Sequence, residues 1–139
     1  MKESATSQKP VKIKLRGLSK TFRHNGNQVD VLTGVDLDIY QGETLAVVGA
    51  SGVGKSTLLH ILGTLERPSA GKVDWEGEDV FSLDDRSLAA FRNRKVGFVF
   101  QDHLLLPQCT ALENVLVAAL PLGKAGREQA ERGRALLKR

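Results

Sequence analysis

One short segment constrains the fold of this chain more than any other. Residues 49–57 read G-A-S-G-V-G-K-S-T and fit the pattern G-x-x-x-x-G-K-[ST]. The apolar run at residues 44–49 precedes the glycines, and leucines at helical spacing follow from Lys55 to about Leu65. A buried parallel strand that turns through a glycine-rich loop into a helix is the setting in which this pattern binds phosphate. The sequence therefore predicts an α/β fold with a P-loop core.

The residue types of this segment suit a nucleoside triphosphate. Glycines let successive backbone N–H groups turn toward phosphate oxygens, and the N-terminus of the following helix adds partial positive charge. We expect Lys55 to reach the β and γ phosphates, Ser56 to ligate Mg²⁺ and Thr57 to help hold the α phosphate. The predicted nucleotide-binding residues of the loop are Gly49, Ala50, Ser51, Gly52, Val53, Gly54, Lys55, Ser56 and Thr57.

The residues before this loop have the alternating pattern of antiparallel strands. Val11, Ile13 and Leu15 alternate with charged residues, which is typical of a half-buried strand. Residues 24–28 (H-N-G-N-Q) have the composition of a hairpin turn, and residues 29–40 resume the alternation. We therefore expect an antiparallel β layer ahead of the P-loop core.

After the loop, a strand is expected around residues 72–75, followed by helices and one more strand. Sequences that resemble capping boxes begin at Ser82 and Thr110, and each predicts that a helix follows. Between them, residues 96–101 (V-G-F-V-F-Q) predict a strand. The helix after Thr110 is expected to stop at Pro121.

Length and composition fit a single globular domain. The chain has 139 residues, of which 41% are hydrophobic and 26% are charged, which is ordinary globular usage. Residues 1–10 are polar and predict a disordered tail, so the folded domain is expected at residues 11–139. The only cysteine, Cys109, cannot pair within the chain, which favours the cytoplasm. The apolar run at residues 111–122 is shorter than the ~20 residues that span a bilayer.

The loop and its flanks resemble one family, the ATP-binding cassette (ABC) ATPases. The stretch G-A-S-G-V-G-K-S-T-L-L is similar to the Walker A segment of that family, and V-L-T-G-V-D-L-D-I-Y-Q-G-E matches the sequence before it. The resemblance implies ATP and Mg²⁺ as cofactors, and it implies that Phe22 in L-S-K-T-F-R stacks on adenine. It also implies that Gln101 senses Mg²⁺ and the attacking water and contacts a membrane subunit. Lys55 and Gln101 are therefore the expected catalytic residues.

Other stretches look most like a subgroup of ABC ATPases, those of lipoprotein release and macrolide export. These are T-L-L-H-I-L-G-T-L-E-R-P-S-A-G and T-A-L-E-N-V. The resemblance implies a homodimer of ATP-binding subunits beneath transmembrane permease subunits, peripheral to the inner face of the cell membrane. The net charge of +4 comes from basic residues near both ends, with acids interspersed and no aromatic ladder. We therefore expect no nucleic-acid partner.

Three landmarks of the resembled family have no counterpart in this sequence and are expected beyond Arg139. They are the signature L-S-G-G-Q, the Walker B strand and the switch histidine, which neither His60 nor His103 resembles. We therefore expect a partial cassette that hydrolyses ATP poorly alone, since a missing general base costs ~10²–10⁴ in rate. Two alternatives stay open: a non-hydrolysing nucleotide-binding module, and a soluble ABC ATPase of DNA repair or translation. Another type of P-loop enzyme, such as a GTPase, is disfavoured because no N-K-x-D motif occurs.

Overall fold

The computed structural model describes residues 9–24, 26–102, 104–122 and 126–138. The chain divides into two compact units, Met1–Asp84 and Asp85–Arg139, and each is described by itself. Most of the predicted tail, residues 1–8, lies outside the described residues, as does His103. Lys9 and Pro10 have no regular secondary structure.

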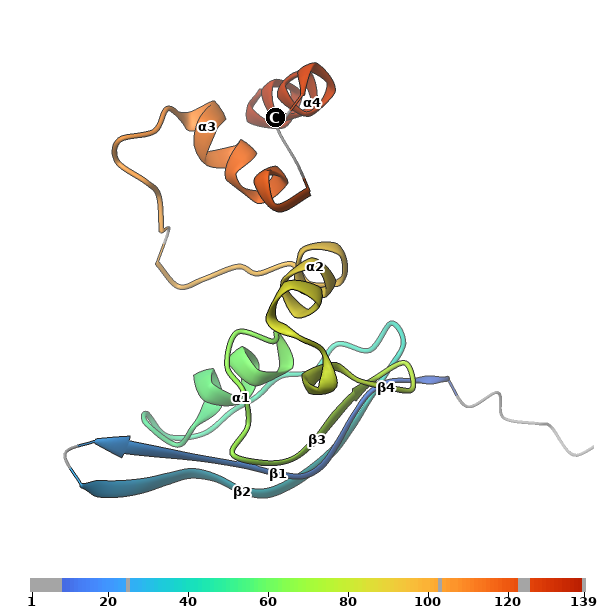
Figure 1. Cartoon of the computed structure of the whole chain (residues 1–139), viewed down its shortest axis with the longest axis vertical. Helices are drawn as coiled ribbons and strands as arrows, with labels where there is room; N and C mark the ends of the chain where they lie inside the picture. Colours follow the sequence, from blue (N-terminus) through green and yellow to red (C-terminus); the bar gives the residue numbers. More distant parts are fainter. Residues whose placement is uncertain (1–8, 25, 103, 123–125, 139) are drawn as a thin grey trace, which may run out of the picture. The chain divides into compact units, whose positions relative to one another are not determined.

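The first unit is built on an antiparallel sheet of four strands in the order β2-β1-β3-β4 (Figure 1). β1 and β2 form the hairpin that the sequence predicts, and β3 begins slightly before the predicted strand at residues 72–75. The strands are β1 (Val11–His24), β2 (Asn27–Tyr40), β3 (Ala70–Trp75) and β4 (Glu78–Asp79).

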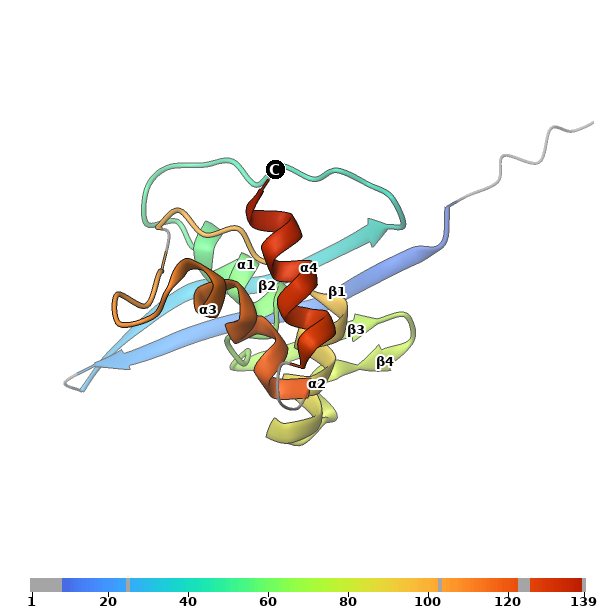
Figure 2. The same ribbon diagram turned by 90° about the horizontal axis from the view of Figure 1, so that it is seen from above.

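β1 lies between β2 and β3 and carries the centre of the core. Leu15 pairs with Leu37 on β2 and with Val73 on β3, and its side chain is fully buried. The helix α1 (Lys55–Leu62) covers one face of the sheet in both views (Figures 1 and 2). The buried apolar side chains of this unit come from the strands, from α1 and from the short 3-10 helix η1 (Val80–Ser82): Ile13, Leu15, Leu18, Leu32, Leu58, Ile61, Leu62, Val73, Trp75 and Val80.

α1 is shorter than the sequence predicts. The helix ends at Leu62, before the predicted end at Leu65, because the chain leaves right-handed helical geometry at Thr64, whose φ is 60°. Leu58 is buried as its spacing predicts. Leu59 and Leu65, by contrast, are 51% and 44% exposed.

The strands predicted at residues 44–49 and 96–101 do not form. Residues 44–49 have no regular secondary structure, and most of their apolar side chains are exposed, with Val48 86% exposed and Val47 half-buried. Residues 96–100 are also irregular, although the Phe98 and Phe100 rings stack at a centroid distance of 5.2 Å, as alternate residues of an extended chain can. A strand exists only through hydrogen bonds to a neighbour, and no segment within the described ranges pairs with either run.

The second unit contains helices where the sequence predicts them, but not the strand predicted at residues 96–101. Its elements are α2 (Asp85–Lys95), α3 (Ala111–Leu116), the 3-10 helix η2 (Val117–Leu122) and α4 (Arg127–Leu137). The helix predicted to open at Ser82 begins only at Asp85, because Ser82 ends the 3-10 helix η1 and its hydroxyl donates to the Asp79 carbonyl at 2.7 Å. The chain tightens from α-helix to 3-10 helix at Val117, before the predicted stop at Pro121. α3 packs closely on α4 at Gly133, where an added Cβ would lie 3.0 Å from Leu112 Cδ1.

A complete capping box begins α3, as predicted. The backbone N–H of Glu113 donates to Thr110 Oγ1 at 3.3 Å, and the backbone N–H of Thr110 donates to Glu113 Oε2 at 2.7 Å. That backbone bond, followed by the bond from the Thr110 hydroxyl, lowers the pKa of the Glu113 carboxyl. A lowered pKa in the folded state stabilises the fold above the ordinary pKa of Glu and stops doing so as pH falls through the lowered value.

We expect Thr110→Ala to lower the free energy of unfolding by about 1 kcal/mol, because a first-turn N–H loses its acceptor. Urea denaturation at neutral pH measures the loss, and Thr110→Ser, which keeps the hydroxyl, is the matched control. The difference between Thr110→Ala and the unsubstituted chain should shrink in acid, where Glu113 is protonated and its half of the box is lost. Equal denaturation midpoints for the alanine and serine variants would contradict the role of the cap.

Candidate nucleotide-binding site

The phosphate-binding loop, residues 49–57, leads directly into α1. Gly54 is the N-cap of α1, with φ 98° and ψ 7°, and no side chain caps the helix. The first turn contains no acidic residue. The positive end of the helix is therefore neither capped nor neutralised by a side chain of its own first turn, which favours an anion there.

Gly54 is required by the space around it as well as by its backbone angles. A Cβ at this position would lie 2.9 Å from both Val31 Cγ1 and the Val31 carbonyl oxygen, and 3.1 Å from Leu32 Cδ2. Its φ of 98° is also one that residues with a side chain rarely adopt. The start of α1 thus lies directly against β2, and only glycine permits this approach.

Lys55 holds the loop in a curved shape. Its ammonium donates hydrogen bonds to the carbonyl oxygens of Gly49 at 2.9 Å and Ala50 at 2.6 Å. These carbonyls lie at the far end of the glycine-rich segment, so the loop curves back around the Lys55 side chain. Ser56 and Thr57 lie in the first turn of α1. Ser56 is exposed and Thr57 is half-buried.

The donor set of the loop fits a triphosphate with a divalent ion. The backbone N–H groups at the start of α1 and the Lys55 ammonium suit phosphate oxygens, and the exposed Ser56 hydroxyl is a suitable oxygen ligand for Mg²⁺. Residues 49–57 contain no carboxylate that would repel phosphate. Across the part of the chain that the structure describes, no three His, Cys, Asp or Glu side chains gather as an independent metal site.

Phe22 belongs to the same unit as the loop. It lies near the end of β1 opposite Val29, and the residue is 41% exposed, so part of its side chain is accessible for stacking. The Lys20 ammonium lies 4.8 Å from the ring centroid. The sequence interpretation missed Lys20, although its position two residues before Phe22 in an alternating strand places both on one face.

Gln101 belongs to the second unit, whereas the other predicted site residues belong to the first. It follows residues 96–100, where no strand forms, and its side chain is exposed. The prediction that it ends a strand was therefore wrong, while its role toward Mg²⁺ stays a prediction. His60 is exposed on α1.

Comparison with family models assigns the chain to a family. Residues 32–139 match the model described as ABC transporter, which is most of the chain. The chain belongs to the ABC transporter family. None of the helices within the described ranges combines the length and hydropathy needed to cross a bilayer.

Relatives within the ABC transporter family agree on a subgroup. The chain is 52% identical to a protein of Geobacter metallireducens over 90% of this chain and 56% of the relative. It is 53% identical to a protein of Myxococcus xanthus over 78% of this chain and 48% of the relative. Both are described as lipoprotein-releasing system ATP-binding protein LolD. The chain thus spans about half the length of the curated relatives it matches.

Solved ABC cassettes share the fold. A structure of the cassette MJ0796, described as a dimeric post-hydrolysis state bound to ADP and Pi, has a TM-score of 0.78 at 39% identity and covers 91% of this chain and 56% of that one. A second structure, described as dimeric MJ0796, a bacterial ABC transporter cassette, has a TM-score of 0.80 at 37% identity, covering 91% of this chain and 54% of that one. The fold class predicted from the sequence, the N-terminal part of an ABC nucleotide-binding domain, is confirmed.

Proposed function

We propose that residues 49–57 bind MgATP and that the chain belongs to an ATP-binding subunit of a lipoprotein-releasing ABC transporter. One observation carries the first part: the start of α1, uncapped by any side chain, lies against β2 at Gly54, with Lys55 inside the curve of the loop. The relatives named LolD support lipoprotein release over macrolide export as the second part.

Each loop residue has a distinct task in this proposal. The Lys55 ammonium exchanges the carbonyls of Gly49 and Ala50 for oxygens of the β and γ phosphates. The Ser56 hydroxyl ligates Mg²⁺, which when bound neutralises charge on the phosphate oxygens. Thr57 helps hold the α phosphate, and Phe22 stacks on adenine.

Hydrolysis and coupling require groups outside the loop. Residues 49–57 contain no carboxylate or histidine that could act as a general base. General-base catalysis typically accelerates a reaction by ~10²–10⁴. We therefore propose that the chain alone binds ATP without efficient turnover. In the whole protein, Gln101 would contact Mg²⁺ and the attacking water and would transmit the state of the nucleotide to the permease subunits. The ATP-binding subunits work there as a homodimer on the cytoplasmic face of the membrane.

The proposal is tested by replacing Lys55 with methionine, which removes the charge and keeps most of the apolar stem. Loss of charge-assisted hydrogen bonds to phosphate should weaken MgATP binding by about 10- to 100-fold, as measured by calorimetric titration. Lys72→Met removes an exposed lysine from β3 and is the matched control. Equal MgATP affinities for the two variants would show that the loop is not the binding site.

A further inference from the structure

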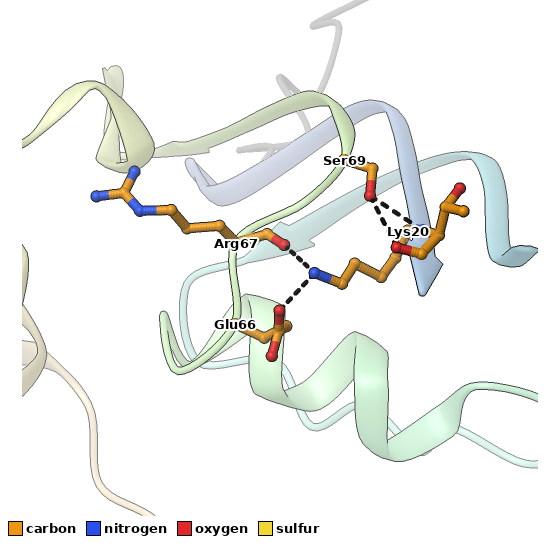
Figure 3. Close-up of polar contacts among 5 residues, drawn as sticks. Lys20, Glu66, Arg67 and Ser69 are labelled. Atoms are coloured by element: carbon orange, nitrogen blue, oxygen red, sulfur yellow. Dashed lines mark hydrogen bonds and ion pairs between the residues drawn. The ribbon is translucent and has the colours of Figure 1, made fainter. Parts of the chain in front are cut away.

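Lys20 is a charged side chain in a nearly buried position on β1. The residue is only 9% exposed, and full burial of an unpaired ammonium is costly. Its Nζ is bonded to Glu66 Oε1 and donates to the Arg67 carbonyl oxygen at 2.8 Å (Figure 3). The ammonium is therefore held in one place by the segment that follows α1.

The same segment is tied to β1 on either side of Lys20. The backbone N–H of Ser69 donates to the Ser19 carbonyl at 2.8 Å. The Ser69 hydroxyl accepts from the backbone N–H of Thr21 at 3.0 Å and donates to the Thr21 carbonyl at 3.3 Å (Figure 3). Together these bonds fix the backbone of β1 where the Lys20 side chain leaves it.

The third neighbour of the Lys20 ammonium is Phe22. The Nζ atom lies 4.8 Å from the ring centroid, within the range of a cation–π interaction. Phe22 is still 41% exposed. A ring with a fixed cation on one face has a defined orientation, and the exposed part of the side chain leaves room for a second flat group.

The charge also favours a stacked base. Two aromatic faces repel each other in a direct sandwich because both carry negative charge. An ammonium on one face of the Phe22 ring draws that charge toward itself and reduces the repulsion at the opposite face. Lys20 thus acts on the ring both by fixing its orientation and by its charge.

We propose that Lys20 is a positioning residue, which presents Phe22 to the adenine base of the bound nucleotide. This inference rests on the proposed function, because it requires that residues 49–57 bind the phosphates and that Phe22 contacts the base. The Glu66–Lys20 ion pair then has two roles: it joins β1 to the segment after α1, and it holds the ammonium that orients Phe22.

The test compares two ligands by calorimetric titration of the chain: MgATP and magnesium tripolyphosphate, which lacks base and ribose. The ratio of the tripolyphosphate dissociation constant to that of ATP measures the contribution of the nucleoside. Lys20→Met should reduce this ratio by about three- to tenfold and leave tripolyphosphate affinity unchanged. A purely structural role would instead weaken both ligands together, or neither, and would overturn the inference.

Phe22→Ala supplies the second arm. If Lys20 acts through the ring, the double variant Lys20→Met/Phe22→Ala should have the same ratio as Phe22→Ala alone. A further fall in the double variant would contradict the inference. Lys20→Arg, which retains a cation, should restore much of the ratio that Lys20→Met loses.

Glu66→Gln keeps the test decisive if Lys20→Met does not fold. Glu66 is on the more exposed side of the ion pair, and the amide weakens the anchor of Lys20 without removing it. Its ratio should lie between those of the unsubstituted chain and Phe22→Ala, and an unchanged ratio would overturn the inference. Failure of the unsubstituted chain to bind tripolyphosphate would instead refute the proposed function, and the inference with it.

Discussion

Replacing Gly71 with alanine is expected to lower the free energy of unfolding by roughly 3–5 kcal/mol, from overpacking together with backbone strain. Gly71 lies in β3 beside the irregular part of β1, and its φ is +86°. An added Cβ would lie 2.4 Å from the Gly17 carbonyl oxygen and 2.7 Å from that of Arg16. These are backbone atoms of the central strand, so relief requires that β1 and β3 separate.

Gly77→Ala is the matched control for this prediction. Gly77 has a φ of +96°, close to that of Gly71, but a Cβ there meets nothing within 4 Å. Its cost should be only the backbone strain, about 1–2 kcal/mol. Urea denaturation of both variants separates the two causes, because only Gly71→Ala adds the clash with β1. Equal losses would mean that β3 can move away from β1 at little cost.

The second large effect is expected from Gly54→Ala, which should reduce both stability and MgATP affinity. The new Cβ would meet Val31 Cγ1 and the Val31 carbonyl at 2.9 Å, so α1 must move away from β2 and take Lys55 with it. We expect a loss of roughly 3 kcal/mol in the free energy of unfolding. MgATP affinity should fall by about tenfold or more, because phosphate binding depends on the helix start and on the lysine.

Gly52→Ala separates clash from strain at this loop. Gly52 has a φ of +79°, and a Cβ there meets nothing within 4 Å. Thermal unfolding should therefore place Gly52→Ala clearly above Gly54→Ala in stability. Identical unfolding midpoints would indicate that the close approach of Gly54 to Val31 is not what holds α1 against the sheet.

The elements that were predicted correctly have local signals. The hairpin follows from alternating apolar residues on both sides of a turn that contains Gly26, whose φ is +79°. The start of α3 follows from Thr110 and Glu113, which form their bonds across a few residues. In both cases the residues that decide the structure are neighbours in sequence.

The two wrong strands have a different physical origin. The apolar runs at residues 44–49 and 96–101 indicate a preference for burial, but a strand also needs a partner from elsewhere in the chain. Both runs are irregular along the described residues, and Val99 is fully exposed. The composition of these segments therefore shows that they are apolar, but it does not show whether another strand pairs with them.

The same limit applies to the candidate site. The identity of the loop residues, from Gly49 to Thr57, could be read from spacing, and the structure adds the geometry of Gly54 and Lys55. The contact between Lys20 and Phe22 could not be predicted, because Lys20 is held in place by Glu66 and Arg67, which lie far along the chain. No local pattern reports such contacts.

The unequal lengths of the strands have a mechanical consequence. β3 pairs with β1 only between Ile13 and Ser19, whereas the hairpin of β1 and β2 continues as far as the turn (Figure 1). Beyond Ser19 the sheet narrows to a two-stranded ribbon, and such ribbons are only marginally stable by themselves. Phe22 lies on this ribbon, just beyond the hydrogen bonds that join Thr21 to Ser69 and Lys20 to Arg67. The end of the ribbon beyond these bonds is therefore expected to be less stable than the three-stranded layer around Leu15, and the bonds of Lys20 and Ser69 limit how much of that instability reaches Phe22.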